Sequence, residues 1–221
     1  VNKNTCAMIT ETVQGEGGVT PATKEFMQGL RQICDENDLL LIIDEIQCGM
    51  GRTGTTFAFG QYGVKPDILT TAKALGGGVP VGAFLVTEKV ASDSLEPGDH
   101  GSTYGGNPLV LTAVNKSIDI IEGRKLPEHV KETSPYFESI LDSFVEKYPF
   151  VKGHRGLGFM QGLIIDERIP VGEILNKALS KGLVLLSAEG NLIRFLPPLI
   201  MEKSGFDEMN KKLSEVLDEF Q

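Results

Sequence analysis

The sequence lacks the features that mark several large classes of protein. Its longest clean apolar run, Leu39–Ile43, is far shorter than the ~20 residues that a membrane-spanning helix needs. Basic residues number 21 against 30 acidic ones, and the net charge of −9 argues against a nucleic-acid binder, which gathers Lys and Arg on one face. We also find no internal repeat and no low-complexity segment. We therefore expect a soluble chain that binds neither membranes nor nucleic acids.

Cysteine and histidine are equally sparse. Cys6, Cys34 and Cys48 form an odd set without a C-x-x-C pair, which indicates a reducing compartment such as the cytoplasm rather than a disulfide framework. Cys48 has no histidine near it in sequence, so we interpret it as a small loop-lining residue and not as a nucleophile. The three histidines show no metal-ligand spacing, and we predict no metal site.

Acidic pairs occur at Asp44-Glu45 and Asp166-Glu167, and such pairs can suggest a hydrolase. Adjacent residues of one strand point to opposite faces, however, so neither pair offers two carboxylates to one substrate. We discount a hydrolase on this ground.

The most informative feature is an acid and a lysine that each close an apolar strand. Asp44 ends the run that starts at Leu39, and Lys73 follows Ile68–Thr71, 29 residues beyond Asp44. In an α/β sheet, ligands bind beyond the carboxyl ends of such strands. A lysine there can form a Schiff base with the aldehyde of pyridoxal phosphate, and a carboxylate can keep the pyridine nitrogen of that cofactor protonated.

Glycines surround both residues. Three glycines lie in the loop 45–54, which lets backbone approach a flat ligand closely. The triplet Gly76-Gly77-Gly78 follows Lys73 and cannot continue a stable helix, so the lysine is predicted to lie on a turn. Taken alone, Lys73 is more often a solvated turn residue and Asp44 a helix cap or turn former. The spacing and the glycine-rich flanks favour the cofactor interpretation.

These segments closely resemble the class III aminotransferases, which are fold-type-I enzymes that use pyridoxal phosphate. Three further motifs match the family in order and spacing, and the resemblance is closest to its acetylornithine members: residues 11–18 (ETVQGEGG), 100–108 (HGSTYGGNP) and 194–199 (RFLPPL). The resemblance runs from about Met8 to the last predicted helix. One departure is Thr12, which stands where the family usually has proline and could loosen that strand end slightly.

The resemblance implies a role for four residues at the cofactor. Lys73 would bind pyridoxal 5'-phosphate and carry the proton of the transfer step, and Asp44 would pair with the pyridine nitrogen. Gln47 would lie against the ring hydroxyl, and Thr103 would bind the cofactor phosphate of the partner subunit. Each active site would then span the interface of a homodimer. The alternative without a function is that the loop at Thr103 is an ordinary polar turn.

Two residues are implied at the substrate. Arg194 resembles the arginine that receives the α-carboxylate, a task suited to a planar guanidinium. Glu16 resembles the glutamate that neutralises this arginine when a side-chain amine reacts. The implied reaction is amino transfer between N-acetylornithine, or a related side-chain amine, and 2-oxoglutarate. The alternative for Glu16 and Arg194 is a surface ion pair, and the 178 residues between them leave their contact open.

Strand and helix patterns alternate in the first half, which predicts an α/β fold with a parallel-type sheet. We expect a helix at 23–37, strands at 6–10, 39–43, 68–71 and 82–87, and a long helix at 108–122. After Gly123 the pattern changes to an α+β layer with helices at 126–147, 171–181 and 207–220 and strands at 158–165, 183–187 and 192–196. We therefore divide the chain into residues 1–123, part of a large cofactor-binding domain, and residues 124–221, a small C-terminal domain.

The expected parallel sheet is short of strands and of covering helices. Class III enzymes carry a further N-terminal half, which contains a phosphate-binding loop, a ring-stacking aromatic and a second substrate arginine. We therefore expect this chain to be the C-terminal portion of such an enzyme, inactive alone. Two alternatives stay open: another class III aminotransferase (ornithine, succinylornithine or 4-aminobutyrate), or a non-catalytic fragment with weak or no cofactor binding.

Overall fold

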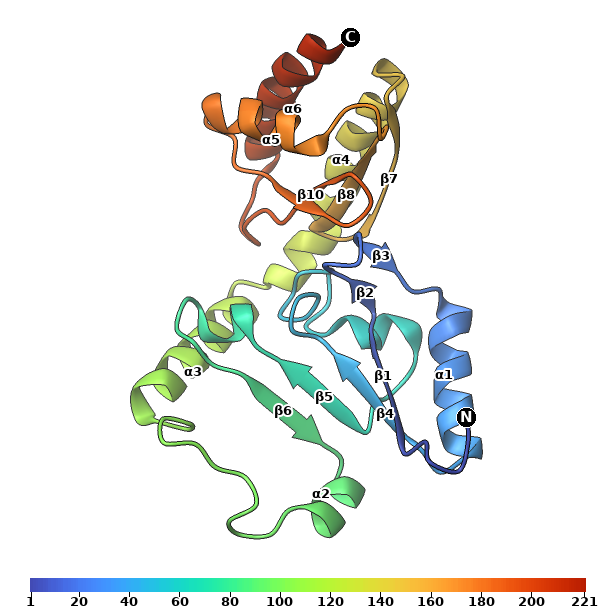
Figure 1. Ribbon diagram of the computed structural model, residues 1–221. Coiled ribbons are helices and arrows are strands. Elements are labelled where there is room, and N and C mark those ends of the chain that lie inside the picture. Colours follow the sequence, from blue (N-terminus) through green and yellow to red (C-terminus); the bar gives the residue numbers. More distant parts are fainter. The chain divides into compact units, whose positions relative to one another are not determined.

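The chain folds into two compact units, each built from a sheet and helices (Figure 1). This computed structural model describes residues 1–221 apart from the side chain of Asp93. Unit 1 comprises Val1–Thr12, Ala22–Gly51 and Thr55–Lys125, and unit 2 comprises Val13–Pro21, Arg52–Gly54 and Leu126–Gln221. The assignment of residues 1–123 to a cofactor-binding domain and of 124–221 to a small domain stays a prediction.

Unit 1 contains a four-stranded mixed sheet. Its strands are β1 (Ala7–Glu11), β4 (Leu40–Asp44), β5 (Ile68–Thr71) and β6 (Ala83–Val86), in the order β1-β4-β5-β6. The first three are parallel, and β6 runs antiparallel to β5. The predicted parallel sheet is therefore confirmed for three strands, with an antiparallel strand at one edge.

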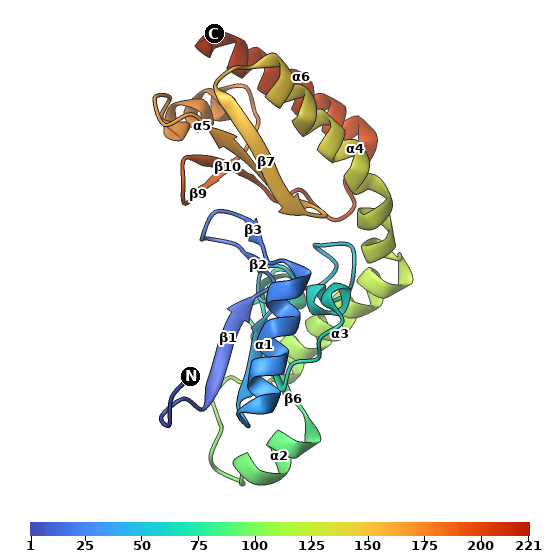
Figure 2. The ribbon, with the colours of Figure 1, turned by 90° about the vertical axis from the view of Figure 1, so that its right-hand side faces the viewer.

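Helix α1 (Lys24–Glu36) covers one face of this sheet, as Figure 2 shows beside β1. The helix begins where the Thr23 hydroxyl accepts a hydrogen bond from the Phe26 amide at 3.1 Å, a typical N-cap. Its apolar face and alternate strand residues form one buried cluster, which includes Met27, Cys34, Leu41, Ile43 and Leu69. The period of two in the strands thus decides which side chains face the helix.

The rest of unit 1 connects and extends this sheet, with these elements: η1 (Ala58–Tyr62), η2 (Lys73–Gly76), α2 (Glu88–Ser94) and α3 (Pro108–Gly123). Helix α3 begins at a proline, and the side chain of Asn107 accepts a hydrogen bond from the Val110 amide at 3.0 Å. Gly123, which we expected just past the end, is its last residue.

Unit 2 is an antiparallel sheet with helices, and its strands follow the order β7-β8-β10-β9. The elements are β7 (Val151–Leu157), β8 (Met160–Ile165), β9 (Leu186–Ala188), β10 (Leu192–Phe195), α4 (Leu126–Lys147), α5 (Val171–Ser180), α6 (Lys203–Leu217) and η3 (Asp218–Phe220). A hairpin of β2 (Val13–Gln14) and β3 (Thr20–Pro21) also belongs to this unit.

Aromatic side chains fill the core of unit 2. Phe137 on α4 stacks on Phe206 of α6 with a centroid distance of 4.6 Å. It also makes edge contacts with Phe159 and Phe195. Such pairs stabilise beyond the area that they bury, so this unit has a large apolar core of its own.

Several elements of unit 2 differ from the prediction. The β2–β3 hairpin was not predicted, and α6 begins at Lys203 rather than at residue 207. Strand β7 was not predicted, because Gly153 and Gly156 lower its strand propensity. The strand expected at 183–187 is β9, three residues later. Helix α5 explains the shift: the Gly182 and Leu183 amides bond to the Leu179 and Ala178 carbonyls, so Leu183 still belongs to a helix-ending Schellman motif. Among the helices that the structure describes, none combines the length and apolar character of a membrane span.

Candidate active site

Asp44 and Lys73 lie at the same edge of the unit 1 sheet. Strands β4 and β5 are parallel neighbours, and Asp44 is the register partner of Thr70. Lys73 opens η2, three residues beyond Thr70. Asp44 is thus the last residue of β4, and Lys73 lies two residues beyond the end of β5. Neighbouring strands are about 4.8 Å apart, and ligands of α/β sheets bind at this edge.

The Asp44 carboxylate is half-buried and partly engaged. Its Oδ1 accepts a hydrogen bond from the Ile46 amide at 2.8 Å. This bond orients the carboxylate. A carboxylate has two oxygens and about four lone-pair sites, so the group can still accept a hydrogen bond from a protonated ring nitrogen.

Lys73 has an unusual backbone for a residue with a side chain. Its φ is 47°, in the left-handed region that non-glycine residues seldom adopt. Gly76 allows the turn behind it to close, because a Cβ there would lie 2.8 Å from the Val81 side chain. The lysine side chain is exposed. An exposed amine and an oriented carboxylate at neighbouring strand ends fit the aldehyde and the ring nitrogen of pyridoxal phosphate.

Gln47 follows in the loop that leaves β4, and a buried glutamate holds this loop. Glu45 accepts hydrogen bonds from the Ala58 amide at 3.0 Å and the Phe59 amide at 2.7 Å. Burial raises the pKa of Glu45, and these two amides only partly offset the effect. Sequence reasoning missed Glu45, although the period of two in β4 puts it on the buried face with Ile43.

The site loop also contacts the strand end at Thr12. The Thr12 hydroxyl and the Cys48 thiol are 3.1 Å apart, and both residues are buried. The Tyr62 hydroxyl and the Ala22 amide donate hydrogen bonds to the Thr12 carbonyl at 3.2 and 2.9 Å. Thr12, which we expected to loosen this strand end slightly, is therefore held by several hydrogen bonds.

Thr103 lies in the exposed segment between α2 and α3. The Ser102 hydroxyl beside it accepts a hydrogen bond from the Gly105 amide at 3.1 Å, so the segment forms a local turn. The role implied for Thr103 concerns the cofactor of a partner subunit, and the single chain does not join Thr103 to Asp44 and Lys73.

Glu16 and Arg194 meet within unit 2. Glu16 lies in the turn between β2 and β3, and its Oε1 is 2.6 Å from Nη1 of Arg194 on β10. The Arg194 side chain is 9% exposed, whereas that of Glu16 is 77% exposed. The arginine is therefore fixed in the sheet, and the glutamate approaches it from solvent.

Arg52 is a further arginine that sequence reasoning did not single out. Burial lowers its pKa to about 10. Its side chain donates to the Pro197 carbonyl, and its own carbonyl accepts from the Phe159 amide at 3.0 Å. Arg52 thus ties the segment 52–54 to the segment that follows Arg194.

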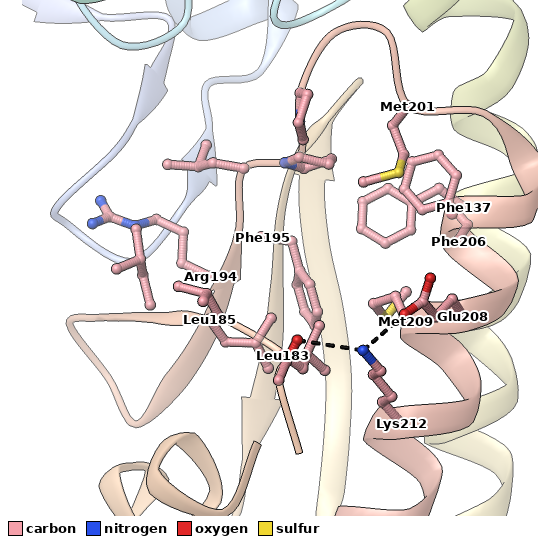
Figure 3. A pocket seen from close by; sticks show the side chains of 17 residues that line it. Phe137, Leu183, Leu185, Arg194, Phe195, Met201, Phe206, Glu208, Met209 and Lys212 are labelled. Carbon is pink, nitrogen blue, oxygen red and sulfur yellow. Dashed lines mark hydrogen bonds and ion pairs between the residues drawn. The ribbon is translucent and has the colours of Figure 1, made fainter. Parts of the chain in front are cut away.

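A cavity of about 440 Å³ opens in unit 2 between the β9–β10 region and α6 (Figure 3). Phe137, Phe206 and Met209 line its apolar wall, and Lys212 contacts Glu208 at 2.7 Å at its margin. Arg194 also borders the cavity, but Figure 3 shows its guanidinium directed away from the aromatic side chains. The cavity and the ion pair of Glu16 therefore use opposite sides of β10.

A family model and curated proteins match this chain. The family described as aminotransferase class-III matches residues 1–217. An acetylornithine aminotransferase of Methanocaldococcus jannaschii is 46% identical over 219 residues, which are 99% of this chain and 54% of that protein. The chain thus spans about half the length of the curated relatives it matches.

Solved structures agree in fold. An ornithine aminotransferase of Plasmodium yoelii has a TM-score of 0.93 at 32% identity, over 99% of this chain and 58% of that one. An ornithine aminotransferase of Toxoplasma gondii, described with partial occupancy of PLP at its active site, has a TM-score of 0.90 at 30% identity, over 96% of this chain and 50% of that one. The expected fold-type-I architecture is confirmed.

Proposed function

This chain belongs to the class-III aminotransferase family, and from that premise we propose that it carries the C-terminal part of a transaminase that uses pyridoxal 5'-phosphate. The reaction moves the side-chain amino group of N-acetylornithine, or of a related amine, to 2-oxoglutarate, which gives a semialdehyde and glutamate. The observation that carries the proposal is the placement of Asp44 and Lys73 after adjacent parallel strands.

Three residues of unit 1 would hold the cofactor of one subunit. When bound, the cofactor accepts the amino group and withdraws electrons into its ring. The Lys73 amine would hold the aldehyde and would carry the proton that moves between substrate atoms. Asp44 would keep the ring nitrogen protonated, and Gln47 would lie against the ring hydroxyl.

Two residues of unit 2 would select the substrate. Arg194 binds the α-carboxylate of glutamate in one half-reaction, and its planar fork suits that group. In the other half-reaction Glu16 neutralises Arg194, so that a side-chain amine can react. Their 2.6 Å contact, with the glutamate exposed and the arginine buried, supports this alternation.

We further propose a homodimer, in which Thr103 of each subunit binds the cofactor phosphate in the other site. The part of the relatives that this chain does not cover would supply the main phosphate loop, the ring-stacking aromatic and a second arginine. The free thiols of the three cysteines support a reducing compartment, and we propose the cytoplasm.

Borohydride reduction of the complete enzyme followed by peptide mapping tests the assignment. We expect the label on Lys73. Replacing Lys73 with alanine should lower the rate of amino transfer by at least about 10²-fold to 10⁴-fold, since proton transfer by a positioned group contributes that much. Lys89→Ala is the control, because Lys89 is exposed and pairs only loosely with Asp38. A label elsewhere would overturn the assignment.

The amino donor needs a separate measurement. The relatives are named for acetylornithine and for ornithine, so single-turnover rates with N-acetylornithine, N-succinylornithine, ornithine and 4-aminobutyrate should be compared. We expect the highest kcat/KM for N-acetylornithine. A higher value for another donor would reassign the substrate and leave the lysine chemistry intact.

A further inference from the structure

Two arginines lie side by side on one face of the unit 2 sheet, with only a glycine between them. Arg155 of β7 is the register partner of Gly162 of β8, and Gly162 is the register partner of Arg194 of β10. Residues directly opposite each other in antiparallel strands share a face of the sheet. Both guanidinium groups therefore leave the same face, which is the one opposite the buried Leu163, Ile193 and Phe195.

The turn between β2 and β3 is bound to both arginines. Arg194 holds the Glu16 carboxylate, and Nε of Arg155 donates to the Gly18 carbonyl at 2.8 Å. The first bond reaches the tip of an exposed side chain, whereas the second reaches the backbone. Release of the Glu16 carboxylate from Arg194 therefore leaves the turn attached to the sheet.

A third bond fixes the same turn from the other side. The Glu189 amide donates to the Glu16 carbonyl at 3.2 Å. Gly18 lies between Arg155 and Glu189, the two residues that bond to the backbone of the turn. A Cβ at Gly18 would be 2.7 Å from Nη2 of Arg155 and 2.8 Å from the Glu189 carbonyl. With a φ of 88°, Gly18 also adopts a backbone that side chains disfavour. The close approach of the Glu189 carbonyl and the positive φ thus require glycine at this position, and a side chain there would also displace the Arg155 guanidinium.

We infer that Arg155 is a positioning residue for the Glu16–Arg194 switch and thereby sets the preference for side-chain amines. It holds the backbone of the turn, so the Glu16 carboxylate returns to Arg194 each time a substrate carboxylate leaves. This inference rests on the proposed function, because the switch matters only if Arg194 alternates between Glu16 and substrate. Without Arg155, Arg194 would be paired with Glu16 for less of the time. The reaction with side-chain amine donors would then slow, and the reaction with glutamate would not.

Arg155→Gln in the complete enzyme tests the inference through the two half-reactions. We expect kcat/KM for N-acetylornithine to fall about tenfold, which corresponds to about 1.4 kcal/mol, while the value for glutamate stays within about twofold. Gly18→Ala should shift the ratio in the same direction, and Arg155→Lys should restore part of it. Arg168→Gln is the matched control, because Arg168 is 83% exposed and pairs with Asp166.

Amide hydrogen exchange gives a readout that does not depend on turnover. We expect residues 15–19 to exchange faster in Arg155→Gln, with the amides of α4 and α6 unchanged. An equal loss in both half-reactions, or unchanged exchange at the turn, would overturn the inference. If the unsubstituted enzyme transferred no amino group from either substrate, the proposed function would fail, and the exchange result would still decide whether Arg155 holds the turn.

Discussion

The two sheets of this chain each have one face against helices, and their other faces differ in chemistry. In unit 1 that face carries the register row Ile9, Ile42 and Ile68, with Asp44 two residues beyond Ile42. Ile9 is 67% exposed. In unit 2 the corresponding face carries Arg155 and Arg194 and binds the turn of Glu16.

This difference bears on the residues proposed for the cofactor in unit 1 and on those proposed for the substrate in unit 2. A charged face is stable in water, and the Glu16–Arg194 ion pair forms entirely within unit 2. An apolar face is stable only when another surface covers it. Asp44 lies at the end of such a face, and a cover would also exclude water from its carboxylate and strengthen its charge interactions. The surroundings of Asp44 in unit 1 therefore depend on a covering surface more than those of the Glu16–Arg194 ion pair in unit 2 do.

Removing the centre of the unit 2 core should have the largest effect on stability. Phe137 is 1% exposed and contacts Phe159, Phe195 and Phe206. Phe137→Ala should lower the free energy of unfolding by about 3–5 kcal/mol, because it removes a large side chain and leaves a cavity. Urea unfolding followed by circular dichroism measures this loss.

The control for that prediction is Phe26→Ala on α1. Phe26 is 52% exposed, and surface substitutions usually change stability by less than about 0.5 kcal/mol. If both variants lost the same free energy, Phe137 would not lie at the centre of the unit 2 core.

The next effect concerns the loop after β4. Glu45→Ala would leave the buried Ala58 amide and the partly buried Phe59 amide without their acceptor. We expect a loss of about 2–4 kcal/mol from unpaired donors and the cavity. Hydrogen exchange at residues 45–59 should rise in this variant and not in the neighbouring α1.

Glu45→Gln distinguishes charge from shape through its pH dependence. Because burial raises the pKa of Glu45 above its ordinary value of 4.5, the folded state binds the proton more tightly than the unfolded state. Ionisation of Glu45 therefore costs stability once the pH rises above about 4.5. The free energy of unfolding of the unsubstituted chain should fall relative to Glu45→Gln between pH 4 and pH 7. A constant difference would show that the carboxylate is not desolvated.

Much of this architecture could be predicted from the sequence. The unbroken apolar run of β4 and the 3.6-residue apolar spacing of α1 are local patterns, and both elements were predicted within two residues. The spacing from Asp44 to Lys73 predicted adjacent strand ends, because a parallel sheet fixes the edge at which strands finish.

Other features could not be predicted, because they depend on contacts distant in sequence. The hydrogen bond from Arg155 to the Gly18 carbonyl joins residues 137 positions apart, and no local pattern connects them. Glu45 appeared as one member of an acidic pair, and only its amide partners from η1 explain its burial. Strand β7 was missed because pairing with β8 overrides the low propensity of its glycines.

A half-buried carboxylate with the opposite pH dependence lies in the same unit. Oδ2 of Asp67 accepts hydrogen bonds from the Leu41 amide and from Arg31, both at 2.8 Å. Burial alone would raise the pKa of Asp67, but these two donors together lower it. Asp67→Asn should cost about 1–2 kcal/mol at neutral pH.

The sign follows from proton linkage. A carboxylate with a lowered folded pKa contributes stability above its unfolded pKa of about 3.9, and it loses that contribution as the pH falls through the folded value. The difference between the unsubstituted chain and Asp67→Asn should therefore shrink below about pH 4. Asp35→Asn is the control, because Asp35 binds the same arginine at 2.8 Å but is 65% exposed. Equal losses in the two variants would contradict a special role for the bond to β4.

The smallest effect on stability should come from the uncovered face itself. Ile9→Thr keeps the β-branched shape and removes an apolar group that is 67% exposed, so the free energy of unfolding should change by less than about 1 kcal/mol. Self-association of the 221-residue chain, measured by light scattering, should decrease, because the apolar row no longer continues to the edge. Leu179→Thr on α5 is the matched control, since Leu179 is 60% exposed in unit 2. If both substitutions reduced association equally, exposed apolar area in general would be responsible, and the contrast between the two faces would lose its physical basis.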